Sequence, residues 1–279
     1  EHMDYYKSVE NLKKYFVKFI EKTPSYGKSY ICIDNNLNVE ITRTLKNKNY
    51  LTYGLKKNAN FKVMNIKQKK SLSIFDLNIS LPGKKKTKIN DIIIPLIGLH
   101  NIQNATAAIA VSFNLGISIK NIKHGLKNFQ GVQRRFNKVF TFRNINFIDD
   151  YAHHPTEIHS VLDGVKAVYK SEKIVCIFQP HRISRLNTLK NKFASCFKNA
   201  DTVILCPIYK AGENINLNFN YEKFAKQLII KSKVELIMIN NEFDLLKYTK
   251  QSIFGNKIVI GMGAGTISSW MKYLGKKLT

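Results

Sequence analysis

The stretch FTFRNINFIDDYAHHPTEIHSVLDGVKAVY, residues 140–169, carries the pattern that decides the fold. Its first ten residues are rich in Phe and Ile and predict a buried strand, and the apolar spacing over 156–169 predicts a helix. Two acids, a tyrosine and two histidines lie within residues 149–154, where these segments meet. A strand that passes through a short polar turn into a helix is the building unit of a parallel α/β sheet.

The same alternation continues to the end of the chain. Further strands are predicted at 173–179, 202–207, 234–239 and 257–261, and further helices at 186–198, 221–231, 242–251 and 266–274. Strict alternation of this kind predicts a Rossmann-like, mostly parallel sheet with helices on both faces. Ligands of such sheets bind outside the carboxyl ends of the strands, so the strand-to-helix junctions are the places where a site is expected.

The first 130 residues have a different texture. The patterns there predict a helix at 9–22, strands at 29–33, 50–54, 61–66, 72–79 and 89–97, and helices at 104–114 and 121–129. We place a domain boundary near Gln130, Gly131 and Val132, which divides the chain into segments 1–130 and 131–279. A segment of about 150 residues is an ordinary domain size.

The chain is strongly basic, with 45 Lys and Arg against 19 Asp and Glu, a formal charge of +26 and a pI of about 9.8. Only six of the basic residues are arginines, at 43, 134, 135, 143, 182 and 185. The lysines are scattered, and their excess together with Ile and Asn is typical of an AT-rich coding sequence. We therefore expect no nucleic-acid partner; an RNA-binding protein is the alternative, and it predicts salt-dependent affinity.

No apolar run reaches the roughly 18 residues that a membrane span needs, so no membrane span is expected. The chain opens on Glu1, His2 and Asp4, which is not the pattern of a secretory signal. The four cysteines, at 32, 176, 196 and 206, form no C-x-x-C pair. Buried, reduced thiols are the expectation, and they fit a cytoplasmic location.

The first chemically dense junction is DDYAHHPTE, residues 149–157. Asp and His are common in turns, and Asp150 alone could cap the following helix, but capping needs one such residue and not five. A metal site is a further alternative, although the adjacent His153 and His154 cannot easily point at one ion. Polar contacts to a ligand are the better interpretation.

The second dense junction is FQPHRISR, residues 178–185, in which Arg182 and Arg185 would share one face of a helical turn. A guanidinium binds carboxylate or phosphate through two hydrogen bonds, which Lys cannot do. The alternative is a solvated start of a helix, but basic residues there oppose the helix dipole. A further pair, Arg134 and Arg135, lies at the domain boundary, where it could reach a phosphate.

Two glycine patterns resemble phosphate-binding loops without completing them. The run from Gly261 to Thr266 has Thr266 where a dinucleotide motif needs its third Gly, so a tight turn near a ligand is predicted. The tripeptide from Gly27 to Ser29 looks like the end of a P-loop, but Lys22 stands where the leading Gly is required. We find no complete P-loop in the chain.

Several motifs together resemble those of the Mur ligases. They are the opening EHMDxY, the runs GLHNIQNAxAA at 98–108 and GVQRRF at 131–136, the two junctions above, and YKAGE at 209–213. The resemblance covers nearly the whole chain in the family's order. It implies three domains in the family, of which this chain corresponds to the later part of the central ATP-binding domain, at 1–130, and the complete C-terminal substrate-binding domain, at 131–279.

The resemblance also implies an activity in peptidoglycan biosynthesis, and so in cell-wall formation, cell shape and cell division. ATP would phosphorylate the lactyl carboxylate of UDP-N-acetylmuramate, and the amine of L-alanine would attack the acyl phosphate, with ATP and Mg²⁺ as cofactors. The family's P-loop would precede Glu1, so this chain would be a partial sequence, inactive by itself. The alternatives are a murein-peptide-recycling ligase that uses the same sugar nucleotide, and a non-catalytic remnant that only binds.

The resemblance assigns roles to individual residues. On the nucleotide side, it implies His2 as a Mg²⁺ ligand, His100, Asn101 and Asn104 at the adenine, Arg135 as a catalytic residue at the phosphates, and Asp150 and Tyr151 at the nucleotide. On the substrate side, it implies His153 as a catalytic residue at the muramyl group, and His181, Arg182 and Arg185 at substrate carboxylates.

Overall fold

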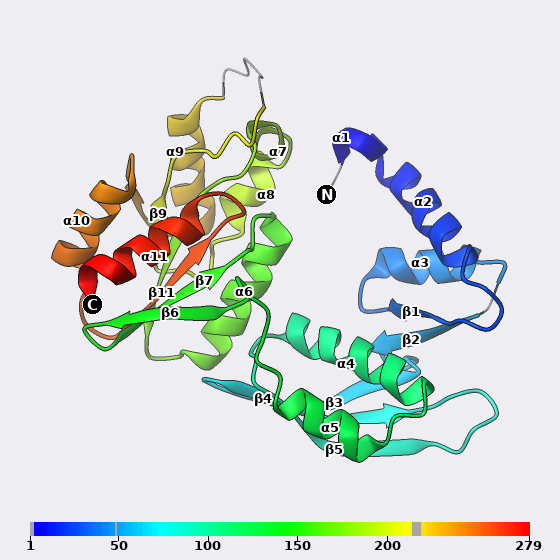
Figure 1. The fold of residues 1–279 in the computed structure, drawn as a ribbon. Coiled ribbons are helices and arrows are strands. Elements are labelled where there is room, and N and C mark those ends of the chain that lie inside the picture. Colours follow the sequence, from blue (N-terminus) through cyan, green and yellow to red (C-terminus); the bar gives the residue numbers. More distant parts are fainter. Residues whose placement is uncertain (1–2, 48, 214–218) are drawn as a thin grey trace. The chain divides into compact units, whose positions relative to one another are not determined.

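The structure is a computed structural model that describes residues 3–47, 49–213 and 219–279. The chain forms two compact units, Glu1–Gln130 and Gly131–Thr279 (Figure 1). Each unit contains its own sheet, and in both units helices occur between the strands along the chain. The expected α/β class is therefore confirmed.

The first unit contains five helices and five strands within its described residues. They are α1 (Met3–Tyr6), α2 (Val9–Glu21), β1 (Ser29–Cys32), α3 (Asn36–Thr44), β2 (Tyr50–Gly54), β3 (Phe61–Lys69), β4 (Leu72–Ile79), β5 (Thr87–Ile94), α4 (Leu99–Asn114) and α5 (Ile119–Lys127). The sheet order is β1-β2-β3-β4-β5, with β1, β2 and β3 parallel and β3, β4 and β5 antiparallel.

Alternating apolar residues give this sheet one fully buried face along β4. Every second residue of β4 is buried, including Phe75 and Leu77, and these side chains pack against Ile102 and Ile109 of α4. A smaller cluster of Ile31, Ile41 and Leu45 joins β1 to α3. The N-terminal end of α4, which carries three of the residues assigned above, is thus held on a packed sheet.

Two helices of this unit differ from expectation. Helix α3 was not predicted; it is nine residues long and is capped by Asn35, which accepts a hydrogen bond from Leu37 N–H. The predicted helix at 104–114 begins five residues earlier, because Gly98 adopts φ +94° and turns the chain directly from the strand region into α4.

The second unit contains six strands and six helices within its described residues. They are β6 (Asn137–Phe142), β7 (Ile145–Asp150), α6 (Pro155–Val168), β8 (Lys173–Phe178), α7 (Ile183–Thr188), α8 (Lys190–Ser195), β9 (Thr202–Leu205), α9 (Tyr221–Ser232), β10 (Glu235–Met238), α10 (Glu242–Ser252), β11 (Lys257–Met262) and α11 (Ile267–Leu278). The sheet order is β10-β9-β8-β11-β7-β6, and only β6 is antiparallel.

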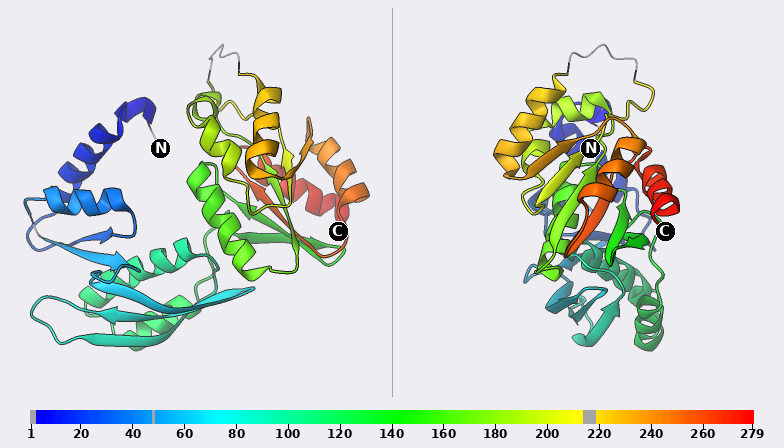
Figure 2. Two further views of the ribbon diagram at one scale, coloured as in Figure 1. Left: turned by 180° about the vertical axis from the view of Figure 1, so that it is seen from behind. Right: turned by 90° about the vertical axis from the view of Figure 1, so that its left-hand side faces the viewer.

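Helices cover both faces of this sheet, as the alternation of strands and helices predicts. Figure 2 shows α10 and α11 on one face and α6, α8 and α9 on the other. On the second face, the ring of Phe178 in β8 lies 5.8 Å from Phe193 and 5.1 Å from Phe197, which anchors α8. On the first face, Met271 and Leu274 of α11 are fully buried against the sheet.

Two predicted elements in this unit are wrong for local backbone reasons. The single strand predicted at 140–149 is the end of β6 and most of β7, joined by a two-residue turn in which Arg143 and Asn144 have φ +50° and +61°. Such a turn favours Gly or Asn, so Arg at its first position hides it. The helix predicted at 186–198 is two short helices that meet at Leu189, whose φ of −109° is not helical.

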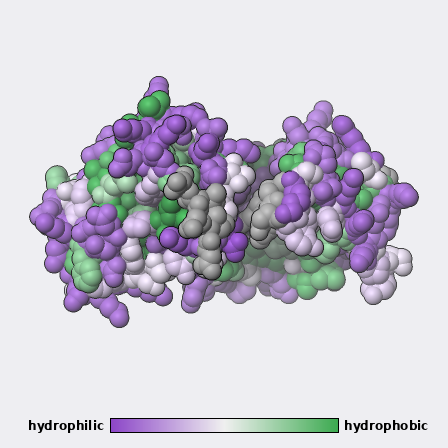
Figure 3. Space-filling model, turned by 90° about the horizontal axis from the view of Figure 1, so that it is seen from above, coloured by the Kyte–Doolittle hydropathy of each residue, from purple (hydrophilic) through white to green (hydrophobic). Residues whose placement is uncertain are grey.

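The surface is mainly hydrophilic, as Figure 3 shows for one face of the molecule. Some large apolar side chains are nevertheless exposed on helices, for example Phe16 and Phe19 on α2 and Ile230 on α9. Among the described residues, no helix is both long and apolar enough to cross a membrane.

We predict that Gly54→Ala destabilises the first unit much more than Gly83→Ala. A Cβ on Gly54 would lie 2.5 Å from Oδ1 of Asp34, which accepts hydrogen bonds from Leu55 N–H and Gln103 Nε2–H through its two oxygens. We expect a loss of about 3 kcal/mol in the free energy of unfolding, since strain and lost hydrogen bonds add.

Gly83 is the matched control, since it also has positive φ but no atom lies within 4 Å of the added Cβ. Its substitution should cost about 1 kcal/mol. Urea denaturation and hydrogen exchange of the β1 and β2 amides measure both effects. Equal losses for the two variants would contradict the role given to Asp34.

Candidate functional site

Four strand ends meet at one edge of the second sheet. The parallel strands β9, β8, β11 and β7 are neighbours in that order, so their carboxyl ends share an edge. The residues that follow them are 206–213, 179–182, 263–266 and 151–154, respectively. Both dense junctions of the sequence and the glycine run at 261–266 are therefore brought together, which sequence reasoning could only predict.

A row of four rings runs across this edge. Tyr151 and His153 meet edge to face with ring centroids 5.1 Å apart, and His153 meets His181 in the same way at 5.8 Å. His181 in turn stacks on Tyr209, with centroids 5.6 Å apart and planes at 18°. The row joins the junctions after β7, β8 and β9 into one surface.

The two acids that end β7 are buried and bind the loop before β6. Asp150 is only 3% exposed, and its two oxygens accept hydrogen bonds from Phe136 N–H (2.9 Å) and Ala152 N–H (2.8 Å). Burial outweighs these bonds and raises the pKa of Asp150 to about 6. Asp149 accepts a hydrogen bond of 2.6 Å from Ser268 Oγ. Its second carboxylate oxygen has no hydrogen-bond partner within the described part of the chain.

Arg134 and Arg135 lie over the first ring of the row. The guanidinium carbon of Arg134 is 4.6 Å from the centre of the Tyr151 ring, and that of Arg135 is 5.7 Å away. Arg134 also donates to the carbonyl of Gly263 at 2.6 Å and lies 3.7 Å from Asp149. Arg134 is thus fixed by the protein, whereas the guanidinium of Arg135 makes no hydrogen bond within the described part of the chain.

His153 has a defined tautomer. Its Nδ1 lies 2.9 Å from the carbonyl oxygen of Tyr151 and 3.4 Å from the carboxylate of Glu157, and both of these atoms only accept. Nδ1 therefore carries a proton, and in the neutral imidazole Nε2 is the accepting nitrogen. The residue is 8% exposed.

His154 caps helix α6, a role for which Asp150 was the candidate in the sequence. Its Nδ1 accepts from Thr156 N–H, and the carboxylate of Glu157 accepts in return from His154 N–H. Pro155 occupies the first helical position of α6. The two adjacent histidines therefore have different roles, one in the ring row and one at the cap.

His181 has the opposite tautomer. Arg185 Nη1 donates to its Nδ1 at 3.2 Å, so Nδ1 is unprotonated and Nε2 carries the hydrogen. Burial, together with the positive charge of Arg185, lowers the pKa of His181 to about 4. His153 and Arg182 contribute in the same direction, and Glu213 opposes them. His181 is therefore neutral near pH 7.

Arg182 and Arg185 do not act as a simple pair on one helix face. Arg182 precedes α7 with φ +68°, and its Nε is buried with no hydrogen-bond partner in the described part of the chain. The loop after β9 holds this junction, since Arg182 N–H donates to the Tyr209 carbonyl at 2.9 Å. Glu213 accepts from both the backbone N–H and the hydroxyl of Ser184. A strained arginine with an unsatisfied buried donor is suited to an anionic ligand.

The glycine run after β11 is a close approach and not a phosphate loop. A Cβ on Gly265 would lie 2.5 Å from Oε1 of Gln179 and 2.6 Å from the ring of Tyr209. Gln179 is 3% exposed, and its amide links Thr266 Oγ1 and Ile267 N–H. Gln179 belongs to the second dense junction of the sequence, but no role was predicted for it. A polar residue directly after a buried strand was the signal.

The three nucleotide-side residues of the first unit lie at the start of α4. Asn101 donates to the carbonyl of Ile97 at 2.7 Å, His100 packs over Gly98, and Asn104 is exposed. Asp34, which the sequence analysis missed, lies beside them: it accepts from Gln103 Nε2 at 2.7 Å. Its signal in the sequence was again a carboxylate at the end of an apolar strand.

His2 lies outside the described residues. Among the residues that are described, no three His, Cys, Asp or Glu side chains gather as a metal site. The segment from Gly27 to Ser29 runs from the turn after α2 into β1, so it does not have the strand-to-helix order of a P-loop. The expectation that it is not a P-loop is confirmed.

Comparison with known proteins identifies the family. The Mur ligase middle domain matches residues 1–112, and the Mur ligase, glutamate ligase domain matches residues 134–265. The chain belongs to the Mur ligase family, and the resemblance seen in its motifs is confirmed.

Within that family, the chain is similar to UDP-N-acetylmuramate–L-alanine ligases. It is 59% identical to that of Pelagibacter ubique over 98% of the chain, and 35% identical to that of Brucella anthropi over the whole chain. It spans 59% of the length of each of these curated relatives. The crystal structure of the UDP-N-acetylmuramate–alanine ligase of Thermotoga maritima matches with a TM-score of 0.74 and 25% identity, over 99% of this chain and 57% of that one.

We predict opposite pH effects from Asp150 and His181 on the stability of the second unit. The raised pKa of Asp150 means that the native state binds more protons than the unfolded state, so its contribution falls as pH rises from about 4 to 6. The lowered pKa of His181 means the reverse, so its contribution rises from about pH 4 to 6.5.

Substitution should separate these two effects. Asp150→Asn should make stability rise more steeply with pH between 4 and 6, and His181→Gln should make it rise less or fall. The Asp150 effect is at most about 3 kcal/mol, from a shift of roughly two pKa units. The fluorescence of Trp270, the one tryptophan of the chain, reports unfolding of this unit in urea. Parallel pH profiles for both variants and the unmodified chain would contradict the assignment.

Proposed function

We propose that the protein to which this chain belongs joins L-alanine to the lactyl carboxylate of UDP-N-acetylmuramate at the expense of ATP, in the cytoplasm. The observation that carries the proposal is the strained Arg182, with its unsatisfied buried Nε, beside the row of rings at the carboxyl ends of β7, β8 and β9. The similarity to ligases of that name supports the choice of substrates.

The residues of this edge divide into binding and positioning groups. Arg182 and Arg185 would hold the carboxylates of the amino acid and the sugar through charge-assisted hydrogen bonds. Arg185 holds His181 neutral, so His181 would add a hydrogen-bond donor, Nε2–H, without adding charge. His153 would meet the muramyl substrate through Nε2, because its Nδ1 is engaged by Tyr151 and Glu157.

Residues of each unit are proposed to contact the nucleotide. Residues 1–130 would belong to the central ATP-binding domain and residues 131–279 to the C-terminal substrate domain. The exposed amide of Asn104 and the neighbouring Asn101 and His100 would contact adenine, since an amide matches the donor and acceptor edge of a purine. Arg135 would stabilise charge on the transferred phosphoryl group.

The contacts of Asp150 and Tyr151 indicate how each of them would take part in nucleotide binding. Asp150 has both oxygens engaged by backbone N–H groups, so its part in nucleotide binding would be to position the loop that carries Arg135. Tyr151 lies under the same guanidinium at 5.7 Å and would support it. Mg²⁺ is proposed as a cofactor with His2 as one ligand, and the described residues form no metal cluster.

A chimera tests the activity. This chain replaces the region that it matches in the ligase of Pelagibacter ubique, and phosphate release is measured with UDP-N-acetylmuramate, ATP and either L-alanine or a murein tripeptide. We expect turnover with L-alanine. Turnover with the tripeptide alone would favour the recycling reaction, and a folded chimera without turnover, beside an active parent, would favour a non-catalytic remnant.

The role of Arg182 is tested in the same chimera. We expect Arg182→Lys to raise the KM for L-alanine by at least about tenfold, because Lys cannot reproduce a two-bonded guanidinium contact worth roughly 1.5–3 kcal/mol. Arg143→Lys, in the turn between β6 and β7, is the control and should leave the KM unchanged. Equal KM values for all three proteins would exclude Arg182 from amino-acid binding.

A further inference from the structure

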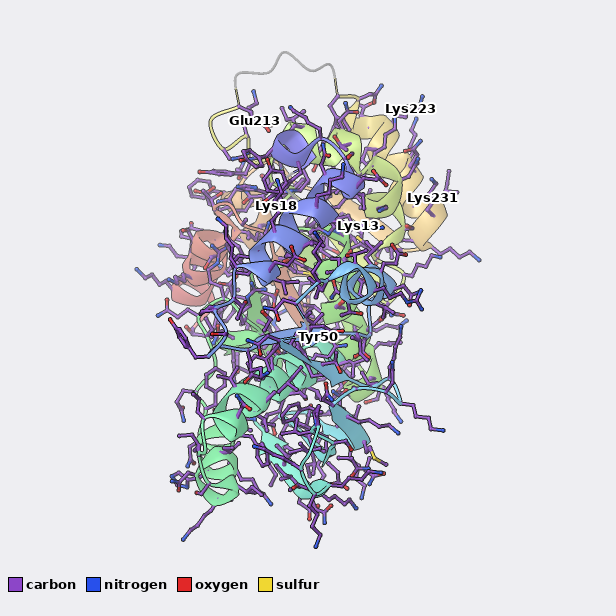
Figure 4. The ribbon with its side chains drawn as sticks, turned by 90° about the vertical axis from the view of Figure 1, so that its right-hand side faces the viewer. Lys13, Lys18, Tyr50, Glu213, Lys223 and Lys231 are labelled. Atoms are coloured by element: carbon purple, nitrogen blue, oxygen red, sulfur yellow. The ribbon has the colours of Figure 1, made fainter. Side chains whose placement is uncertain are left out.

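Most lysines of the chain are spread over separate elements. Figure 4 shows examples: Lys13 and Lys18 project from α2, and Lys223 and Lys231 from α9. Several of them are engaged locally, since Lys13 pairs with Glu40 and Lys231 donates to Asn191 Oδ1 at 2.9 Å. Scattered lysines are what an AT-rich coding sequence produces. A place where lysines from several elements lie together needs a different explanation.

Five lysines converge on one pocket at the amino end of the second sheet. The pocket has a volume of about 580 Å³, and its lysines are Lys166, Lys173, Lys198, Lys233 and Lys257. Lys173 and Lys257 are the first residues of β8 and β11, and Lys233 lies just before β10. The pocket is thus at the opposite end of these strands from the row of rings.

The positive charge of the pocket exceeds its negative charge. Its five ammonium groups face two carboxylates, those of Asp201 and Glu235, which leaves three positive charges unbalanced. Both acids are already engaged, since Asp201 pairs with Lys173 at 3.1 Å and Glu235 accepts from Thr202 Oγ1 at 2.9 Å. The side chains of Lys198 and Lys233 make no hydrogen bond or ion pair within the described part of the chain.

The lowered pKa of Asp201 shows that these lysines stabilise negative charge in the pocket. Partial burial alone would raise its pKa, yet the pKa is lowered, because Ile174 N–H and Lys173 donate to it and Lys166 adds positive potential. Two lysines from different elements, α6 and β8, therefore already stabilise one anion in this pocket.

Lys233 adds an independent observation. It ends α9 in the left-handed conformation, with φ +56° and ψ +43°, where Gly or Asn is usual because a larger side chain is strained. A lysine at this position makes the end of α9 less stable than a glycine would. The same residue places an unpaired ammonium group at the pocket, so the strain coincides with a charge that has no partner.

We propose that this pocket binds a compact polyanion of the pyrophosphate type, at a site separate from the candidate active site. Apart from Ala200, every residue lining it is polar or charged, whereas sites for drug-like organic ligands are mostly apolar. All its cations are lysines, which attract as point charges and do not impose the planar geometry of an arginine fork. The pocket therefore selects for charge and compactness.

The two ends of the sheet can be occupied together. β8 and β11 each have six residues, so the pocket and the row of rings are separated by about 20 Å along the strands. A polyanion in the pocket would not compete with a ligand at the carboxyl ends. The same strands carry residues of both sites, since β8 begins at Lys173 and leads to Gln179 and His181.

Calorimetric titration of the 279-residue chain with pyrophosphate tests the proposal, at low salt and without Mg²⁺. We expect Lys233→Gly to weaken binding about fivefold, and Lys198→Gln combined with Lys233→Gly to weaken it about twentyfold or more, since each loses an unpaired positive charge. Lys233→Gly also relieves the left-handed strain, so its melting temperature should not fall, and weaker binding is then not a sign of unfolding.

Lys7→Gly is the matched control, because Lys7 is also a left-handed lysine, with φ +64°, and lies in the other unit. Its affinity should stay within about twofold of that of the unmodified chain, since Lys7 does not line the pocket. Unchanged affinity of Lys233→Gly, equal losses in Lys7→Gly, or no measurable binding to the unmodified chain would each overturn the proposal. A loss in Arg182→Lys instead would place the pyrophosphate at the candidate active site and overturn it too.

Discussion

The buried carboxylate of Asp150 is the contact on which the candidate site depends. It accepts hydrogen bonds from Phe136 N–H and Ala152 N–H, which fixes the loop before β6 against the end of β7. Because of that contact, Arg134 and Arg135 come over the ring of Tyr151. Burial raises the pKa of Asp150, so the charged group is retained at a cost to stability, as is common where position matters more than stability.

The two ends of the second sheet have different chemistry for a topological reason. Parallel strands place all their carboxyl ends on one edge and all their amino ends on the other. The carboxyl edge collects rings and arginines, with tautomers fixed by Tyr151 and Arg185. The amino edge collects lysines around a polar pocket. The two ends of one sheet thus differ in the side chains that they present: oriented rings and arginines at one end, and lysines at the other.

Periodicity predicted the elements that make long, regular patterns, and local backbone geometry decided the others. The strand and helix on either side of DDYAHHPTE, and the strand that leads to FQPHR, occur close to their predicted positions as β7, α6 and β8. The turn at Arg143 and Asn144 and the break at Leu189 were missed, because left-handed or non-helical backbone at Arg and Leu has no marker in composition. The short helix α3 was missed because Asn and Thr have weak helix propensity.

The sequence by itself determined the α/β class, the family and the arginines and histidines of the two junctions, because these depend on local pattern and residue identity. Only the tertiary structure decided which groups meet: the opposite tautomers of His153 and His181, and the buried Asp150. It also decided that five scattered lysines share one pocket. These features come from contacts between residues far apart in the chain, and from the desolvation and charge that such contacts create, which no local pattern records.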